Sequence, residues 1–182
     1  MSQDARPTSS RTPRRSQRGQ AVIEFAFFFM ALMILLAGVV DIGTLLDDHM
    51  DVVYAARQGA RTGAVLGRTD PQADCKIIAA IHSALLNQPN LTATRIVIYD
   101  SDASGNSTGA QDVYVEPANC SSPSTNTWPP SSRSDTVYFE DSLGVEIDYT
   151  YQFQFNWFGV GPFAGSDHAV FPISPSSASS ST

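Results

Sequence analysis

Glu24 is the only charged residue between positions 21 and 40, and it lies five positions after Gly19. A helix of these twenty residues is about 30 Å long, which is enough to cross the hydrocarbon core of a bilayer. A carboxylate in such a segment costs free energy, so it is usually retained for a function. This spacing therefore predicts a membrane-inserted helix whose single carboxylate requires a partner.

Cys75 and Cys120 are the two cysteines of the chain. An even number of cysteines in an oxidising compartment predicts one disulfide bond, and two unpaired buried thiols are the alternative. Neither cysteine lies in a C-x-x-C motif, so the pattern does not favour a redox or zinc site.

The acidic segment that starts at Asp100 is a weak candidate for a calcium site. Asp100, Asp102 and Ser104 place oxygen ligands at alternate positions, and Gly105 follows them. Gln111 stands where the bidentate Glu of a calcium loop belongs, so an ordinary hairpin turn is favoured. The three histidines are scattered, and no Ser-His-Asp order or phosphate-binding loop is present. The sequence therefore predicts no catalytic residue, no cofactor and no metal site beyond this weak one.

The distribution of charge predicts a single-pass membrane orientation. Five arginines precede the apolar run, namely Arg6, Arg11, Arg14, Arg15 and Arg18. Acidic residues follow the run, and no Lys or Arg appears after it until Arg57. The positive-inside rule then places the N-terminus in the cytoplasm and everything after position 40 outside. A cleaved secretory signal peptide is the alternative, but its apolar core is shorter, at about 7–15 residues.

The chain after position 19 carries 17 acidic and six basic residues, so nucleic-acid binding is not expected. Its pattern predicts four segments: a basic, disordered leader over 1–19, a helix over 20–67, an α+β head over 68–173 and a disordered tail over 174–182. The helix, continuous from about residue 21 to 67, would be about 70 Å long. Small residues at positions 59 and 63 are expected to pack against the protein's own sheet.

Within the head, the spacing of apolar residues predicts a second helix over 72–86. Short β-rich runs predict strands over 94–99, 112–115 and 135–139. Residues 143–155 alternate regularly between apolar and polar, which predicts a strand with one covered face and the long helix as its cover. Residues 169–173 predict a last edge strand, and the stretches 101–111 and 118–134 predict loops.

Three segments resemble the N-terminal signature of TadE-like pseudopilins, which are minor pilin-like subunits of the tight-adherence (Flp, type IVb) pilus system. They are GQAVIEF at 19–25, GVVDIG at 38–43 and AARQGAR at 55–61. Two departures from the family pattern are the absence of a proline within the apolar run and Thr44 in place of an arginine. The resemblance implies a type IV pilin-like α+β fold, in which a long N-terminal transmembrane helix continues into a small antiparallel-sheet head.

The resemblance also implies how the chain is processed. In this family a prepilin peptidase cleaves after the glycine, here between Gly19 and Gln20. Glu24 and Phe25 would then be mature residues five and six, and the carboxylate would meet a free N-terminal amine during assembly. A paired buried carboxylate is tolerated where a lone one is costly.

The expected function is therefore a minor pilin or pseudopilin that initiates or builds a tight-adherence pilus. The implied partners are other pilins and pseudopilins, the prepilin peptidase and an inner-membrane assembly platform. The implied location is the bacterial inner membrane, with incorporation into an extracellular pilus as a further step. The alternative is an uncleaved bitopic envelope protein whose outer domain binds a ligand or a surface partner, and an exported hydrolase is a remote third.

Overall fold

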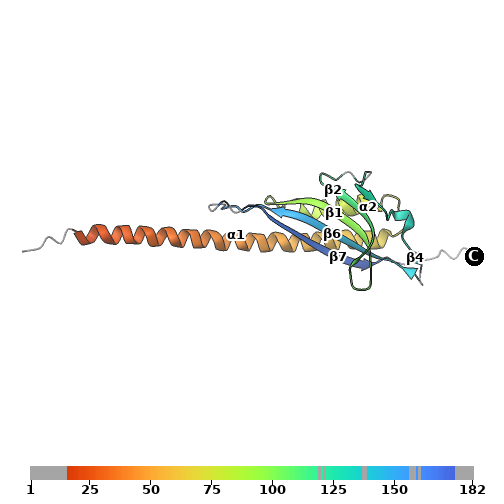
Figure 1. Cartoon of the computed structure of the whole chain (residues 1–182), viewed down its shortest axis with the longest axis horizontal. Coiled ribbons are helices and arrows are strands. Elements are labelled where there is room, and N and C mark those ends of the chain that lie inside the picture. Colours follow the sequence, from red (N-terminus) through yellow and green to blue (C-terminus); the bar gives the residue numbers. More distant parts are fainter. Residues whose placement is uncertain are drawn as a thin grey trace, which may run out of the picture. The chain divides into compact units, whose positions relative to one another are not determined.

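The computed structural model describes residues 16–118, 120, 122–136, 139–155, 159 and 161–174. The chain forms two compact units, residues 1–40 and 41–182. The second unit holds the C-terminal part of helix α1 (Ser16–Leu66), helix α2 (Ala73–Leu85) and the strands (Figure 1). The remaining elements are β1 (Leu91–Ser101), β2 (Ser107–Val115), β3 (Thr125–Asn126), the short 3₁₀ helix η1 (Pro130–Ser132), β4 (Asp135–Thr136), β5 (Phe139–Glu140), β6 (Ser142–Tyr151) and β7 (Phe163–Pro172).

Helix α1 starts earlier than the sequence predicts. It begins at Ser16 rather than near Gln20, so the last residues of the predicted disordered leader are helical, while residues 1–15 lie outside the described part. Gln and Arg are good helix formers, and the nearest proline upstream is Pro13, so the helix extends back through Arg18.

Gly67 ends α1. Its backbone has a φ of +51°, a left-handed conformation that glycine adopts without steric cost, and its N–H donates to the Gly63 carbonyl oxygen (2.8 Å). The helix therefore ends at the predicted position. Helix α2 also matches its prediction to within one residue at each end.

A five-stranded antiparallel sheet forms the body of the head, in the order β3-β2-β1-β6-β7. The central pair, β1 and β6, runs from Leu91 opposite Tyr151 to Ser101 opposite Ser142. Strand β7 pairs with β6 along its whole length and forms one edge, as predicted for the last strand. The α+β class with a long N-terminal helix is thus confirmed.

Strands β1, β2 and β7 extend beyond their predicted limits, because polar residues continue the hydrogen-bonded ladder without an apolar pattern. Strand β2 starts at Ser107 rather than near Asp112, and its first residues are exposed or half-buried. Strand β7 starts at Phe163 rather than Ala169 because its N-terminal half pairs with β6. Backbone pairing with a neighbouring strand determines where β2 and β7 begin, and the periodicity of their side chains does not indicate that pairing.

The single strand predicted over 135–139 is wrong. Strands β4 and β5 lie in this region and pair with each other in a separate two-stranded sheet. Asp141 closes this hairpin: its carboxylate accepts the Ser134 N–H (2.6 Å), and its own N–H donates to the Ser134 carbonyl (3.1 Å). The predicted loop over 118–134 also contains β3 and η1.

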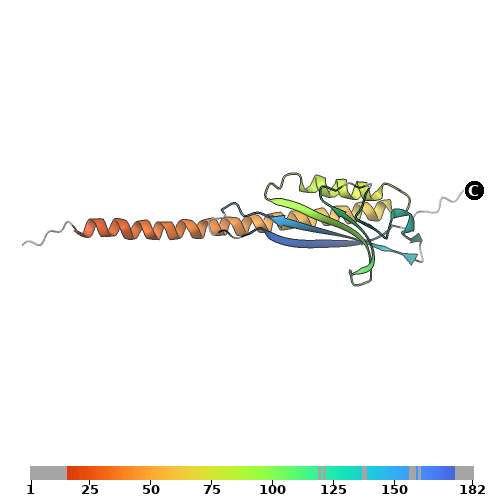
Figure 2. The ribbon, with the colours of Figure 1, turned by 45° about the horizontal axis from the view of Figure 1, so that its top comes forward.

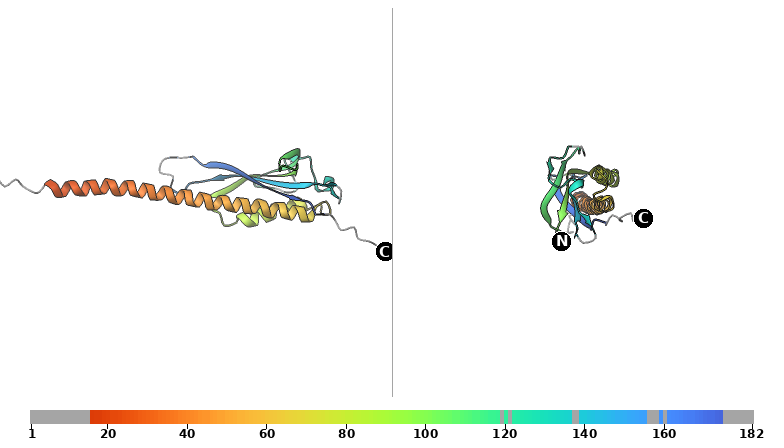
Figure 3. Two further views of the ribbon diagram at one scale, coloured as in Figure 1. Left: turned by 90° about the horizontal axis from the view of Figure 1, so that it is seen from below. Right: turned by 90° about the vertical axis from the view of Figure 1, so that its right-hand side faces the viewer.

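Both helices cover the same face of the sheet, as the end-on view in Figure 3 shows, and α2 lies beside the C-terminal part of α1 (Figure 2). The close approach of α1 to α2 and to β6 depends on two glycines of α1. A Cβ at Gly59 would lie 2.8 Å from a side-chain carbon of Ile81, and a Cβ at Gly63 would lie 2.8 Å from side-chain carbons of Ile77 and Leu143. The predicted packing against the sheet is confirmed for Gly63, which meets Leu143 of β6, whereas Gly59 packs against α2.

The predicted alternation of β6 is also confirmed. Its covered face contributes Val145, Ile147, Tyr149 and Tyr151, which are all buried. Val145, Ile147 and Tyr149 share one hydrophobic cluster with buried small residues of α1, chiefly alanines. This core fixes the second half of α1 on the sheet and so sets the position of Asp41, where the head begins.

Candidate processing and assembly segment

Gly19 and Gln20 lie in the first turns of α1, and both are exposed. A Cβ placed on Gly19 would meet no described atom within 4 Å. A glycine here is therefore not required for packing within the described chain.

Glu24 and Phe25 lie one turn further along α1, and both are exposed. The Phe25 ring stacks on that of Phe29, with centroids 6.0 Å apart. Up to position 40, the described apolar side chains are exposed or half-buried, including thirteen large ones with between 41% and 75% of their surface accessible. Such a surface requires an apolar environment or partner helices.

Helix α1 is the one helix of the described chain that is long and apolar enough to cross a membrane, with a mean hydropathy of 2.5 in its most apolar window. That window is entirely unburied, which is unlike the core helix of a soluble protein. Length and composition thus agree with a single-pass membrane segment near the N-terminus.

Asp41 follows the apolar run directly and is buried in the head. Its carboxylate accepts the backbone N–H groups of Gln154 (3.1 Å) and Phe155 (3.3 Å). The strand predicted over 143–155 ends earlier, at Tyr151. Beyond it the Gln152 N–H donates to the Asn90 carbonyl oxygen (2.8 Å), and the N–H groups of Gln154 and Phe155 bind Asp41 rather than β7. From the sequence, Asp41 was expected only to contribute to the charge asymmetry and to the family signature, and not to bind backbone groups.

Two further side-chain contacts join α1 to β6. The hydroxyl groups of Thr44 and Tyr151 lie 2.7 Å apart, and His49 Nδ1 lies 3.0 Å from the Tyr149 hydroxyl. Thr44 stands where the family pattern often has an arginine, and here its hydroxyl bonds to Tyr151. Polar groups as well as the alanine-rich contact thus fix this part of the helix on the sheet.

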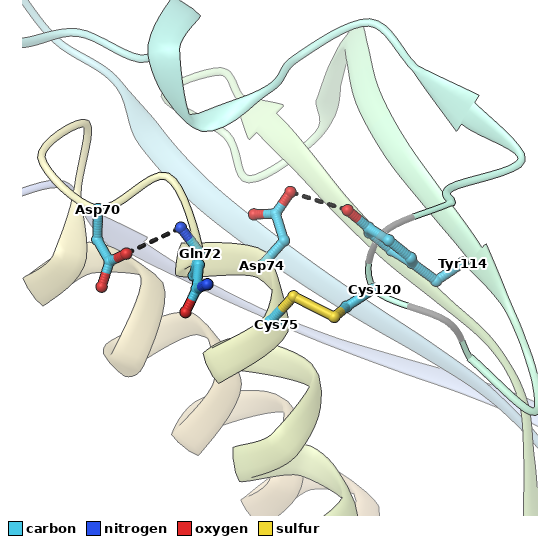
Figure 4. The surroundings of a disulfide bond; sticks show 6 residues. All are labelled: Asp70, Gln72, Asp74, Cys75, Tyr114 and Cys120. Atoms are coloured by element: carbon cyan, nitrogen blue, oxygen red, sulfur yellow. Dashed lines mark hydrogen bonds between the residues drawn. A yellow bond between two sulfur atoms is a disulfide. The ribbon is translucent and has the colours of Figure 1, made fainter.

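The predicted disulfide is present and joins Cys75 in the first turn of α2 to Cys120 after β2 (Figure 4). The bond closes a loop with a sequence separation of 45. Asp74, next to Cys75, points toward the sheet, where it accepts a hydrogen bond from the Tyr114 hydroxyl (2.9 Å).

A buried charge cluster lies beside this disulfide, and the sequence analysis did not find it. Arg133 is 1% exposed, and its Nη2 donates to Asp74 and lies 3.8 Å from an oxygen of Asp112. Its guanidinium carbon also lies 4.7 Å from the centroid of the Trp128 ring. The only signal was a single arginine in a Ser/Pro-rich stretch, which pattern reading assigns to a solvated loop.

Burial changes the acid–base behaviour of this cluster. Desolvation raises the pKa of Asp112, and the Trp128 N–H and the Arg133 cation offset it only in part. Desolvation, with Asp74 as the next cause, raises the pKa of Tyr114, so its hydroxyl stays protonated and donates to Asp74. These groups hold η1 and the following loop against α2 and β2, and the arrangement is that of a structural cluster.

The segment that starts at Asp100 comprises the end of β1 and the turn that leads to β2. One carboxylate oxygen of Asp102 accepts the backbone N–H groups of Ser104 (2.8 Å) and Asn106 (2.9 Å), which holds the pKa of Asp102 below its usual value. Asp100 accepts a hydrogen bond from the Thr108 hydroxyl (2.8 Å). The three candidate ligands are thus brought into one loop, and the Asp102 carboxylate serves the turn itself. Among the described residues, no group of three or more His, Cys, Asp or Glu side chains is placed to hold a metal ion.

Comparison with known families gives one match, and it falls on the helix that carries these features. The model of the family described as TadE-like protein matches residues 19–61. No curated protein and no solved structure gives a significant match to the chain. The match starts at Gly19, includes Glu24 and Asp41, and ends within the part of α1 that packs on the sheet. Over residues 19–61, the chain is therefore similar to the TadE-like protein family.

Proposed function

We propose that this chain is a minor pilin-like subunit that is processed after Gly19 and then assembles with other pilins to initiate or build a tight-adherence pilus. Similarity to the TadE-like family suggests a protein associated with that pilus system. The observation that carries the finer proposal is the pairing of Gly19 with Glu24 at the start of an exposed apolar helix.

The chemistry of assembly follows from Glu24. Cleavage after Gly19 would create a free amine on Gln20, four residues before Glu24 on the same helix. An amine and a carboxylate compensate one another in an apolar environment, whereas either one alone is costly there. The amine and the carboxylate can belong to the same chain or to neighbouring chains, so the pair favours association of helices that each carry both groups. Prepilin peptidase and an inner-membrane assembly platform are the further partners in this proposal.

Cleavage at Gly19 tests the proposal directly. Co-expression with a prepilin peptidase should yield a membrane-bound protein whose N-terminal residue is Gln20, as read by intact mass and N-terminal sequencing. Gly19→Val should abolish this product, because a peptidase that requires glycine cannot accept a branched side chain.

Gly38→Val is the matched control. Like Gly19, Gly38 is helical and exposed, with no described atom within 4 Å of an added Cβ, and its valine variant should be cleaved normally. An intact leader on the wild-type chain in the presence of an active peptidase would contradict the proposal. The chain would then fit an uncleaved bitopic envelope protein.

Glu24→Ala should leave insertion and cleavage intact but reduce co-purification with partner pilins by about tenfold or more. The loss of one paired charge inside the membrane corresponds to at least about 1.4 kcal/mol, and that energy is a factor of ten in association. Asp47→Ala removes an exposed carboxylate beyond the apolar run and should retain normal assembly. Normal amounts of partner with Glu24→Ala would rule out the assembly role of this carboxylate.

A further inference from the structure

Phe153, Phe155 and Phe163 lie near the first turn of α1 within the head, which begins at Asp41. Phe163 is the cross-strand partner of Tyr151, so both side chains lie on the face of the sheet that α1 covers. The Tyr151 hydroxyl meets Thr44, and the ring of Phe153 stands edge-on to that of Tyr151, with centroids 5.3 Å apart. Phe153 and Phe163 therefore lie beside the first turn of α1 within the head.

Phe155 is held at the same place by Asp41, whose carboxylate accepts its backbone N–H. Asp41 is bonded covalently to Val40, the last residue of the apolar run. Phe155 is 41% exposed and Phe163 is 45% exposed, so both rings retain a large accessible surface. Wherever the apolar run ends, these rings lie near that end, because chain connectivity alone requires it.

The segments that carry these phenylalanines, and the first turns of α1 in the head, contain few charged residues. Residues 149–166 contain no Asp, Glu, Lys or Arg, and on α1 none lies between Asp41 and Asp47. Six helical residues correspond to about 9 Å, which resembles the interfacial layer of about 5–8 Å on each side of a bilayer core. The one carboxylate within this layer, that of Asp41, is buried and hydrogen-bonded.

We propose that Phe153, Phe155 and Phe163 insert into the headgroup layer of the membrane from which α1 emerges, and hold the head on the lipid surface. The proposal rests on the proposed membrane insertion of residues 21–40. Aromatic side chains favour the boundary between the acyl chains and water, and the uncharged surface around these rings removes the main cost of placing them there. The head is then attached to the bilayer at two places, through α1 and through this phenylalanine cluster.

Quenching by brominated lipids tests this contact. Full-length Phe163→Trp is reconstituted into phosphatidylethanolamine–phosphatidylglycerol vesicles, with or without bromine at carbons 6 and 7 of one acyl chain. The control is Val65→Trp. Val65 is 68% exposed near the end of α1 and lies about 36 Å along that helix from Asp41. Trp128 and Trp157 are present in both variants, so the difference from wild type isolates the added indole.

Brominated lipid should reduce the emission added by Phe163→Trp roughly twofold or more, while that of Val65→Trp should not change. Phe155→Trp gives the same readout if Phe163→Trp disturbs the edge strand. Unquenched emission from a chain that floats with the vesicles would overturn the lipid contact and leave the proposed function intact. A blue-shifted but unquenched signal would assign the rings to a protein partner instead. A chain that does not float with the vesicles would overturn membrane anchoring and this inference together.

Discussion

Arg133→Met should reduce the free energy of unfolding of the head by about 3–5 kcal/mol, the usual cost of removing one partner from a buried ion pair. The substitution roughly preserves the apolar volume of the side chain but removes the cation, which leaves Asp74 and Asp112 in a desolvated site. Asp74 would keep its hydrogen bond from Tyr114, which compensates only part of its charge. Chemical denaturation of the full chain in detergent micelles, followed by near-UV circular dichroism, measures the change.

Arg95→Met is the matched control. Arg95 pairs with Asp148 at 2.6 Å, but their side chains are 45% and 25% exposed, so the loss should be about 0–1 kcal/mol. Adding Asp74→Asn to Arg133→Met should recover part of the stability, because it removes one of the two uncompensated charges. Equal stability of the two arginine variants would show that the buried cluster contributes no more than a surface pair.

Replacing both cysteines, Cys75→Ser with Cys120→Ser, should cost about 4 kcal/mol, the chain-entropy value for a closed loop of this length. The loop contains most of α2 and all of β1 and β2, so the unfolded chain gains considerable freedom when it opens. The same denaturation experiment applies. Reductant should lower the wild-type stability to that of the double variant and leave the double variant unchanged. A double variant as stable as the oxidised wild type would show that the disulfide does not stabilise the head.

Much of the fold follows from local pattern. The period of β6 and the helical spacing in α2 both indicate a buried face; α2 lies where its pattern predicts it, while β6 ends four residues before its predicted end. The two cysteines and the small residues of α1 also led to correct contacts, since each has few physical uses in such a chain. Gly19 and Glu24 were identified from spacing and resemblance, and their roles remain predictions.

The features that pattern reading missed all depend on contacts between distant segments. Arg133 becomes a buried residue only because α2 and β2 bring two carboxylates to it. Asp41 acts on backbone groups more than a hundred residues away, and its side chain gives no local sign of this. The polar halves of β2 and β7 are strands because a neighbour pairs with them. The sequence of one segment does not indicate which distant segment it will contact, so these contacts could not be predicted from local pattern.

The end of β7 has a practical consequence for labelling. Ile173 is fully buried, and the Ser174 N–H donates to the Ala64 carbonyl oxygen (2.9 Å) in the last turns of α1. Any chain that continues past Ser174 therefore leaves the head about 35 Å along α1 from Asp41. An epitope or fluorescent protein fused to that end would project away from the junction between head and apolar run. Fusions at this end are thus suited to following the protein in living cells without blocking the surfaces proposed to act.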